Sequence, residues 1–81
     1  MKAHVYVTLK RTVLDAQGKT VADALRRMSY AGVADVRQGK YFLLTFENGM
    51  ESGAAHAETE RIAREVLINP VIEEFTFDIE P

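Results

Sequence analysis

The sequence contains no cysteine, no long apolar run, no internal repeat and no low-complexity segment. The absence of cysteine excludes disulfide bonds, thiolate nucleophiles and metal sites built on cysteine, and it is consistent with a cytoplasmic protein. No apolar stretch approaches the roughly 20 residues that cross a bilayer, so the sequence predicts no membrane span. The first residues already follow a strand pattern, and we therefore expect no secretory signal.

An excess of charge of one sign is also absent, because the formal net charge of the 81 residues is −2. A chain of this length forms one domain, residues 1–81, and leaves a large share of its surface uncovered, which favours partners. Basic residues are more frequent in the first half and acidic residues in the second. The basic residues are scattered over several predicted elements, so we expect no nucleic-acid partner.

Two hydrophobic periodicities divide the chain. Residues 3–10 alternate between apolar and polar side chains, which predicts a half-buried strand. Asp15 is a good helix N-cap and Gly32 a good helix stop, and apolar residues recur between them at helical spacing. A second helical pattern, with Ala55, Ile62, Ala63, Val66 and Leu67 facing inward, ends before Asn69-Pro70. Residues 71–80 alternate again and predict a closing strand.

Residues 33–46 are extended and apolar, and Gln38-Gly39 interrupts them. This pattern fits either a hairpin of two strands or one long strand bent at the glycine. The element order is then β-α-β(β)-α-β. Two amphipathic helices on one face of a small sheet give a two-layer α+β sandwich with a ferredoxin-like outline.

The opposite sheet face mixes aromatic, aliphatic and hydroxyl side chains. Such a surface is either solvated or covered by a second subunit. Its expected members are His4, Tyr6, Thr8, Tyr41, Leu43, Thr45, Ile72 and Thr76.

The sequence patterns that would indicate catalysis or the binding of a phosphate or metal ion are incomplete. Gly18-Lys19-Thr20 ends like a phosphate-binding loop, but that loop requires a glycine at position 13, which is valine. His4 and His56 have no carboxylate at a metal-ligand spacing. Glu73 and Glu74 are adjacent on a strand and point to opposite faces. The sequence therefore predicts no catalytic, cofactor-binding or metal-binding residue.

Three segments closely resemble the PurS family, the small subunit of phosphoribosylformylglycinamidine (FGAM) synthase. They are VYVTLKRTVLDAQGKTVADAL (Val5–Leu25), VADVRQGKYFLLTF (Val33–Phe46) and LINPVIEEFTFDIE (Leu67–Glu80). The resemblance has the right length and order, although Ala16 stands where the family often has proline. The match is poor between residues 48 and 57, so no role is carried over there.

The resemblance implies a function in de novo purine synthesis. The enzyme converts formylglycinamide ribonucleotide to its amidine with ATP and ammonia released from glutamine. A large synthetase subunit binds ATP, with magnesium, and the substrate, while a separate glutaminase subunit makes the ammonia. The small subunit is expected to be non-catalytic, to bind no cofactor, and to bridge the other two subunits as a homodimer or tetramer.

Two groups of residues follow from these arguments. Candidate structural residues are Asp15, Gln17 and Gly18 at the helix entry, and Asn69 and Pro70 at the helix-to-strand turn. Candidate partner-interface residues are Tyr6, Arg37, Gly39, Lys40, Tyr41 and Leu43. For Arg37 and Lys40 the alternative is a solvated surface charge.

The alternative function is a regulatory dimer of ferredoxin-like fold that binds a small molecule. The sequence leaves open whether the chain forms dimers or tetramers, which face meets which partner, and whether it has a direct part in the ammonia path.

Overall fold

A computed structural model describes residues 1–81. Its elements are β1 (Lys2–Leu9), α1 (Ala16–Arg27), β2 (Gly39–Thr45), α2 (Ser52–Ile62) and β3 (Glu73–Glu80), and a π-helical turn, η1 (Ala63–Leu67), continues α2. This arrangement confirms the α+β class and the order β-α-β-α-β. No helix is both long and apolar enough to span a membrane.

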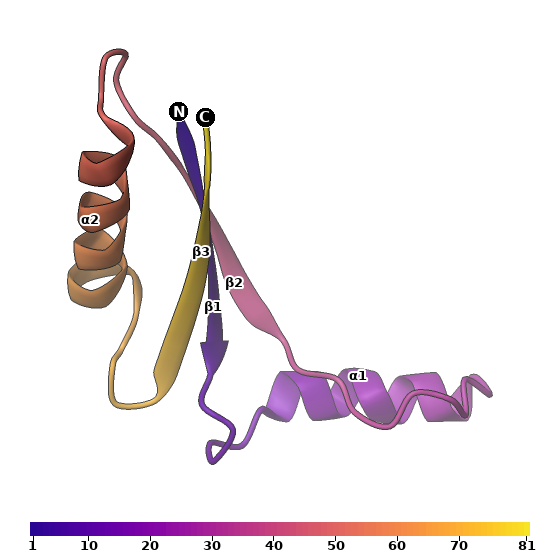
Figure 1. The fold of residues 1–81 in the computed structure, drawn as a ribbon. Coiled ribbons are helices and arrows are strands. Elements are labelled where there is room, and N and C mark those ends of the chain that lie inside the picture. The colour runs from indigo at the N-terminus through magenta and orange to yellow at the C-terminus, as the bar shows by residue number, and fades with distance from the viewer.

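The three strands form one antiparallel sheet in the order β2-β1-β3. Val5 lies opposite Phe42 on β2 and Phe77 on β3, so these apolar side chains share one face. α2 packs on this face (Figure 1), where Ala55 and Ala63 are fully buried. Alanine has no side chain beyond Cβ, so these positions allow the helix to approach the strands closely. The core therefore lies between α2 and the sheet.

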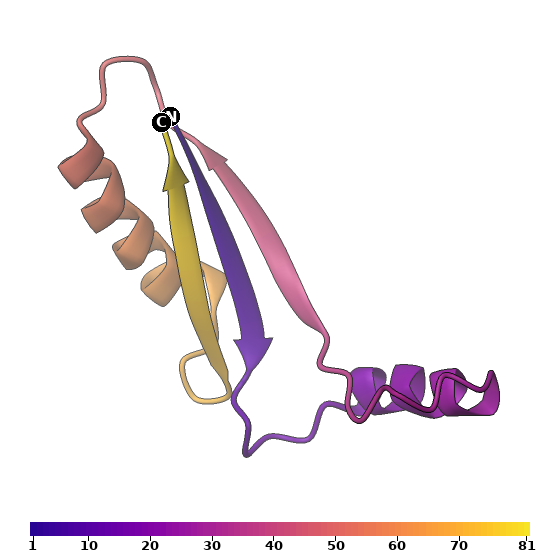
Figure 2. The same cartoon turned by 45° about the vertical axis from the view of Figure 1, so that its right-hand side comes forward.

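We expected α1 to cover the same face of the sheet as α2, and this prediction is wrong. Figures 1 and 2 show α1 extending away from the end of the sheet opposite to the two termini. It packs against the chain segment that returns to β2, and the helix and this segment together form an arm, residues 10–38. The principal extents are 50 × 26 × 13 Å and the radius of gyration is 16.1 Å, against about 12 Å for a compact chain of this length.

The direction of α1 follows from its contacts. Gly18 and Ala22 are the buried residues of the helix, and the return segment approaches Gly18 through the carbonyl of Val36. Arg26 Nη2 donates a hydrogen bond to the carbonyl of Ala34 at 2.8 Å. These contacts hold α1 to its own return segment, whereas the apolar side chains of Leu14, Val21 and Met28 remain exposed.

Residues 33–46 form neither a hairpin nor one long bent strand. Pairing with β1 begins at Gly39, and residues 33–38 run as irregular chain beside α1. Gly32 is not the helix stop, because α1 ends at Arg27 and Ser29 adopts a left-handed φ of 74°.

Two other predictions about the direction of side chains are wrong. Val66 is 73% exposed because the wider π-helical turn changes the direction of side chains after Ile62. Ile72 lies in the turn before β3 and is not part of the sheet face.

Candidate functional site

Asp15 connects the start of α1 to the chain that enters β2. It is the N-cap of α1, and its Oδ1 accepts a hydrogen bond from the Gly18 N–H at 2.9 Å. Its Oδ2 accepts a second bond from the Gln38 N–H at 2.6 Å. The Gln38 side chain also donates to Gln17 Oε1 at 2.7 Å. One nearly buried carboxylate thus fixes both chains of the arm where they meet.

Arg37 binds the link between β1 and α1. Its Nη2 donates to the carbonyl oxygens of Leu9, Lys10 and Val13 at 3.4, 3.1 and 3.3 Å. These contacts cross from the return segment to the outgoing chain, so Arg37 orients the arm relative to the sheet. Contact between Arg37 and a partner remains a prediction.

Two glycines permit the close approach of these chains. A Cβ on Gly18 would fall far inside van der Waals contact with Asp15 Oδ2 and the Val36 carbonyl oxygen. A Cβ on Gly39 would meet the Val7 carbonyl oxygen in the same way. We call Asp15, Gly18, Arg37, Gln38 and Gly39 the arm base.

The turn between η1 and β3 is fixed beside the arm base. Glu73 Oε1 accepts a hydrogen bond from the Asn69 N–H at 2.7 Å, and Asn69 Oδ1 accepts one from the Val71 N–H at 3.1 Å. Lys10 Nζ donates to the Pro70 carbonyl at 2.8 Å. Asn69 and Pro70 therefore lie in a turn that is bonded to both of its neighbouring segments.

Lys40 and Glu73 connect the two edge strands. Lys40 Nζ lies 3.3 Å from Glu73 Oε2, and the Glu73 side chain is 11% exposed. The two residues sit on the helix-covered face, on either side of β1. A contact of Lys40 with a partner remains a prediction. The role of Glu73 was not predicted, although its position four residues after Asn69 was a usable signal.

Hydrogen bonding lowers the pKa of both carboxyl groups. The Gln38 N–H is the main cause for Asp15, the Gly18 N–H is the next, and burial acts in the opposite direction. The Asn69 N–H is the main cause of the lowered pKa of Glu73, where burial also opposes and Lys40 assists. Both groups are therefore held as carboxylates that accept bonds from the backbone.

The second candidate site is the sheet face that α2 leaves uncovered, the free face. Tyr6 lies opposite Tyr41, and His4 lies opposite Leu43. The Tyr6 and Tyr41 rings are 5.5 Å apart, and His4 stacks on Tyr41 at 5.9 Å. Tyr6, Tyr41 and Leu43 are 44, 53 and 47% exposed. We call these four side chains the aromatic patch.

His4 orders the aromatic patch. Its Nδ1 lies 2.5 Å from the Tyr41 hydroxyl, and its Nε2 lies 3.3 Å from Glu80 Oε2. The structure thus brings Tyr6, Tyr41 and Leu43 together among the predicted interface residues. It places Arg37 and Gly39 in the arm base and Lys40 on the opposite sheet face.

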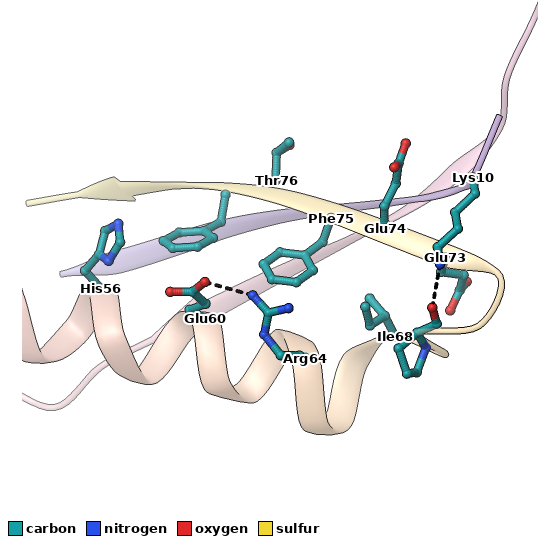
Figure 3. A pocket seen from close by; sticks show the side chains of 11 residues that line it. Lys10, His56, Glu60, Arg64, Ile68, Glu73, Glu74, Phe75 and Thr76 are labelled. Carbon is teal, nitrogen blue, oxygen red and sulfur yellow. Dashed lines mark hydrogen bonds and ion pairs between the residues drawn. The ribbon is translucent and has the colours of Figure 1, made fainter.

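A cavity of 560 Å³ lies between α2 and β3. Figure 3 shows His56, Glu60 and Arg64 projecting from the helix side toward β3. Arg64 donates to Glu60 at 2.8 Å and lies 5.5 Å from the centre of the Phe75 ring. No three His, Asp or Glu side chains converge closely enough to hold a metal ion.

The fold and these surfaces define a small α+β protein whose distinctive features are contact surfaces and a projecting arm. The family model described as PurS, phosphoribosylformylglycinamidine (FGAM) synthase, matches residues 2–81. A Mycobacterium leprae relative, phosphoribosylformylglycinamidine synthase subunit PurS, is 40% identical over 75 residues, which cover 93% of this chain and 90% of the relative.

Solved structures show the same similarity. PurS from Bacillus subtilis has a TM-score of 0.81 and 40% identity, with 99% of this chain and 98% of that chain covered. A chain in the structure of PurLQS from Thermotoga maritima has a TM-score of 0.85 and 28% identity, with coverage of 95% and 93%. The chain belongs to the PurS family of phosphoribosylformylglycinamidine synthase subunits.

Proposed function

We propose that this chain is the non-catalytic assembly subunit of an FGAM synthase complex in purine biosynthesis. It bridges the glutaminase and the ATP-dependent synthetase subunits for ammonia transfer. The observation that carries this proposal is the family match over residues 2–81. The similarity to a chain of the Thermotoga maritima PurLQS structure supports it, because that structure contains a relative of this chain within an assembly.

Self-association is part of the proposal. Leu14 just before α1, Val21 within it and Met28 at its C-cap are spaced seven residues apart and are 75, 41 and 65% exposed. A single chain leaves this apolar stripe without cover, although burial of such side chains is favourable by about 1.5–3 kcal/mol each. A second copy that covers the stripe gives a homodimer, and pairing of dimers gives a tetramer.

The remaining assignments follow from the proposed complex. The large subunit binds ATP and magnesium, and this chain binds no cofactor. The complex acts in the cytoplasm, where purine nucleotides are made. The arm base fixes the direction of the arm, so we expect the arm to act as a rigid spacer between subunits.

Reconstitution tests the proposed function. The purified glutaminase and synthetase subunits are mixed with and without this chain, and product formation from glutamine is followed. We expect glutamine-dependent activity to require the chain, whereas activity with added ammonium salt should not. Equal glutamine-dependent activity in both mixtures would exclude the assembly role.

The cavity between α2 and β3 favours the alternative of a small-molecule-binding regulatory dimer. Its volume of 560 Å³ lies within the range of about 300–1,000 Å³ typical of ligand pockets. Calorimetry with intermediates of purine synthesis separates the two functions. Saturable heat would support the regulatory dimer, and its absence would support the assembly subunit.

A further inference from the structure

The free face carries an asymmetric distribution of charge. Glu74, Asp78 and Glu80 alternate along β3 with the inward-facing phenylalanines and Ile79, so all three are on the free face. We call these three carboxylates the acidic row. They lie opposite Thr8, His4 and Lys2 of β1.

The acidic row borders the aromatic patch. The patch occupies β1 and β2, and the row follows the neighbouring edge strand. Lys2 is the one lysine or arginine among the strand residues of this face, against three carboxylates, and His4 Nε2 lies 3.3 Å from one of these, Glu80 Oε2. The free face therefore combines the exposed aromatic patch with the negatively charged acidic row at its edge.

We propose that the free face docks onto a protein surface that presents arginine or lysine side chains beside a flat apolar area. This inference rests on the proposed function, because the partner is the glutaminase or the synthetase subunit of that complex. Arginine suits both halves of the face, since its guanidinium pairs with carboxylates and also stacks on tyrosine rings. Tyrosine and arginine are enriched at the centres of protein interfaces.

A second copy of this chain fits the free face poorly. Its own free face offers one lysine for three carboxylates, so two such faces cannot neutralise each other. Self-association has a separate apolar surface on the arm, where Val21 and Met28 are exposed. The two surfaces therefore serve different partners, the arm for a second copy and the free face for a basic protein.

The test compares charge reversals on the two sides of the molecule. Asp78→Lys changes the acidic row, and Glu58→Lys makes the same change at an exposed position of α2. Affinity for the purified glutaminase and synthetase subunits is measured at low and high salt with the full chain. We expect Asp78→Lys to weaken binding of one subunit about tenfold or more at low salt. Glu58→Lys should stay within about twofold of the original chain.

A second variant tests the contribution of the aromatic patch to binding. Tyr41→Ala should weaken binding of the same subunit by about tenfold, because exposed tyrosines of this kind are frequent energetic centres. The urea midpoint and the solution mass of each variant are measured alongside. Weakened binding with an unchanged midpoint and mass supports docking at the free face.

Three results would overturn the inference. The first is equal affinity of Asp78→Lys and Glu58→Lys. The second is weakening by Tyr41→Ala alone, because the partner would then lack the basic groups. The third is a change of oligomeric mass in Asp78→Lys, which would assign the face to self-association. If the original chain binds neither subunit, both this inference and the proposed function fail. If the original chain binds a subunit and the variants give one of the three results above, only this inference fails.

Discussion

Replacement of Gly18 by alanine should destabilise the protein, although alanine is the better helix former. The added Cβ would overlap Asp15 Oδ2 and the Val36 carbonyl oxygen. Overpacking of this kind costs about 1–3 kcal/mol, and contact with two separate groups favours the upper end. The gain in helix propensity returns about 1 kcal/mol. We expect the free energy of unfolding to fall by about 2 kcal/mol.

Gly53→Ala is the matched control. Gly53 lies in the first turn of α2, and an added Cβ there would meet Glu51 Oε1 at 3.9 Å, an ordinary contact. This variant should be as stable as the original chain or more stable by up to about 1 kcal/mol.

Urea unfolding at one fixed protein concentration measures both variants, because self-association would otherwise shift the midpoint. With a slope of about 1–1.5 kcal/mol per M, Gly18→Ala should lower the midpoint by about 1–2 M. If Gly18→Ala matched or exceeded the stability of the original chain, the account of the arm base would be refuted.

Three further predictions concern the arm and the turn beside it. Arg37→Ala removes three hydrogen bonds to backbone carbonyls and should cost about 1–2 kcal/mol in urea unfolding, whereas the exposed Arg27→Ala should be neutral. The pKa of Glu73 is lowered from its ordinary value of 4.5, so its contribution to stability is present above that pH and is lost as the pH falls through the lower folded-state value. Glu73→Gln should therefore flatten the acid side of the stability profile, and the exposed Glu74→Gln should not. Met28→Asp places a charge in the apolar stripe of the arm and should reduce the mass in sedimentation equilibrium to that of one chain; Arg27→Asp, one residue away, is the control, and equal masses would contradict self-association through the arm.

The alternation of side chains along β1 and β3 was predictable because it depends on local spacing, whereas the apolar pattern of residues 33–38 wrongly indicated a strand. Val5 and Val7 are buried and Tyr6 between them is exposed, as the period of two requires. The same argument placed Tyr41 and Leu43 on the free face, and the register with β1 agrees. A half-buried strand shows in its own residues which side faces the core.

The position of α1 could not be predicted in this way. Apolar residues at helical spacing, such as Val21 and Met28, indicate that one side of a helix is buried but not what buries it. The usual assumption is that the nearest sheet buries this side of the helix. Here Gly18 and Ala22 face the return segment instead. The hydrogen bonds of Asp15 to Gln38 and of Arg37 to the β1–α1 link join residues more than twenty positions apart. No local pattern contains that pairing.

Two of the segments that resemble the PurS family meet at the arm base, and the turn in the third segment lies beside it. Asp15 accepts bonds from backbone N–H groups, Arg37 donates to backbone carbonyls, and Glu73 accepts from the N–H of Asn69. Each of these charged groups is directed at the chain itself: Asp15 and Arg37 join the two chains of the arm, and Glu73 holds the turn before β3. A side chain committed to backbone atoms in this way is poorly placed to bind a substrate. These charged residues of the resembling segments therefore determine shape, as expected of a subunit whose contribution is the relative position of its neighbours.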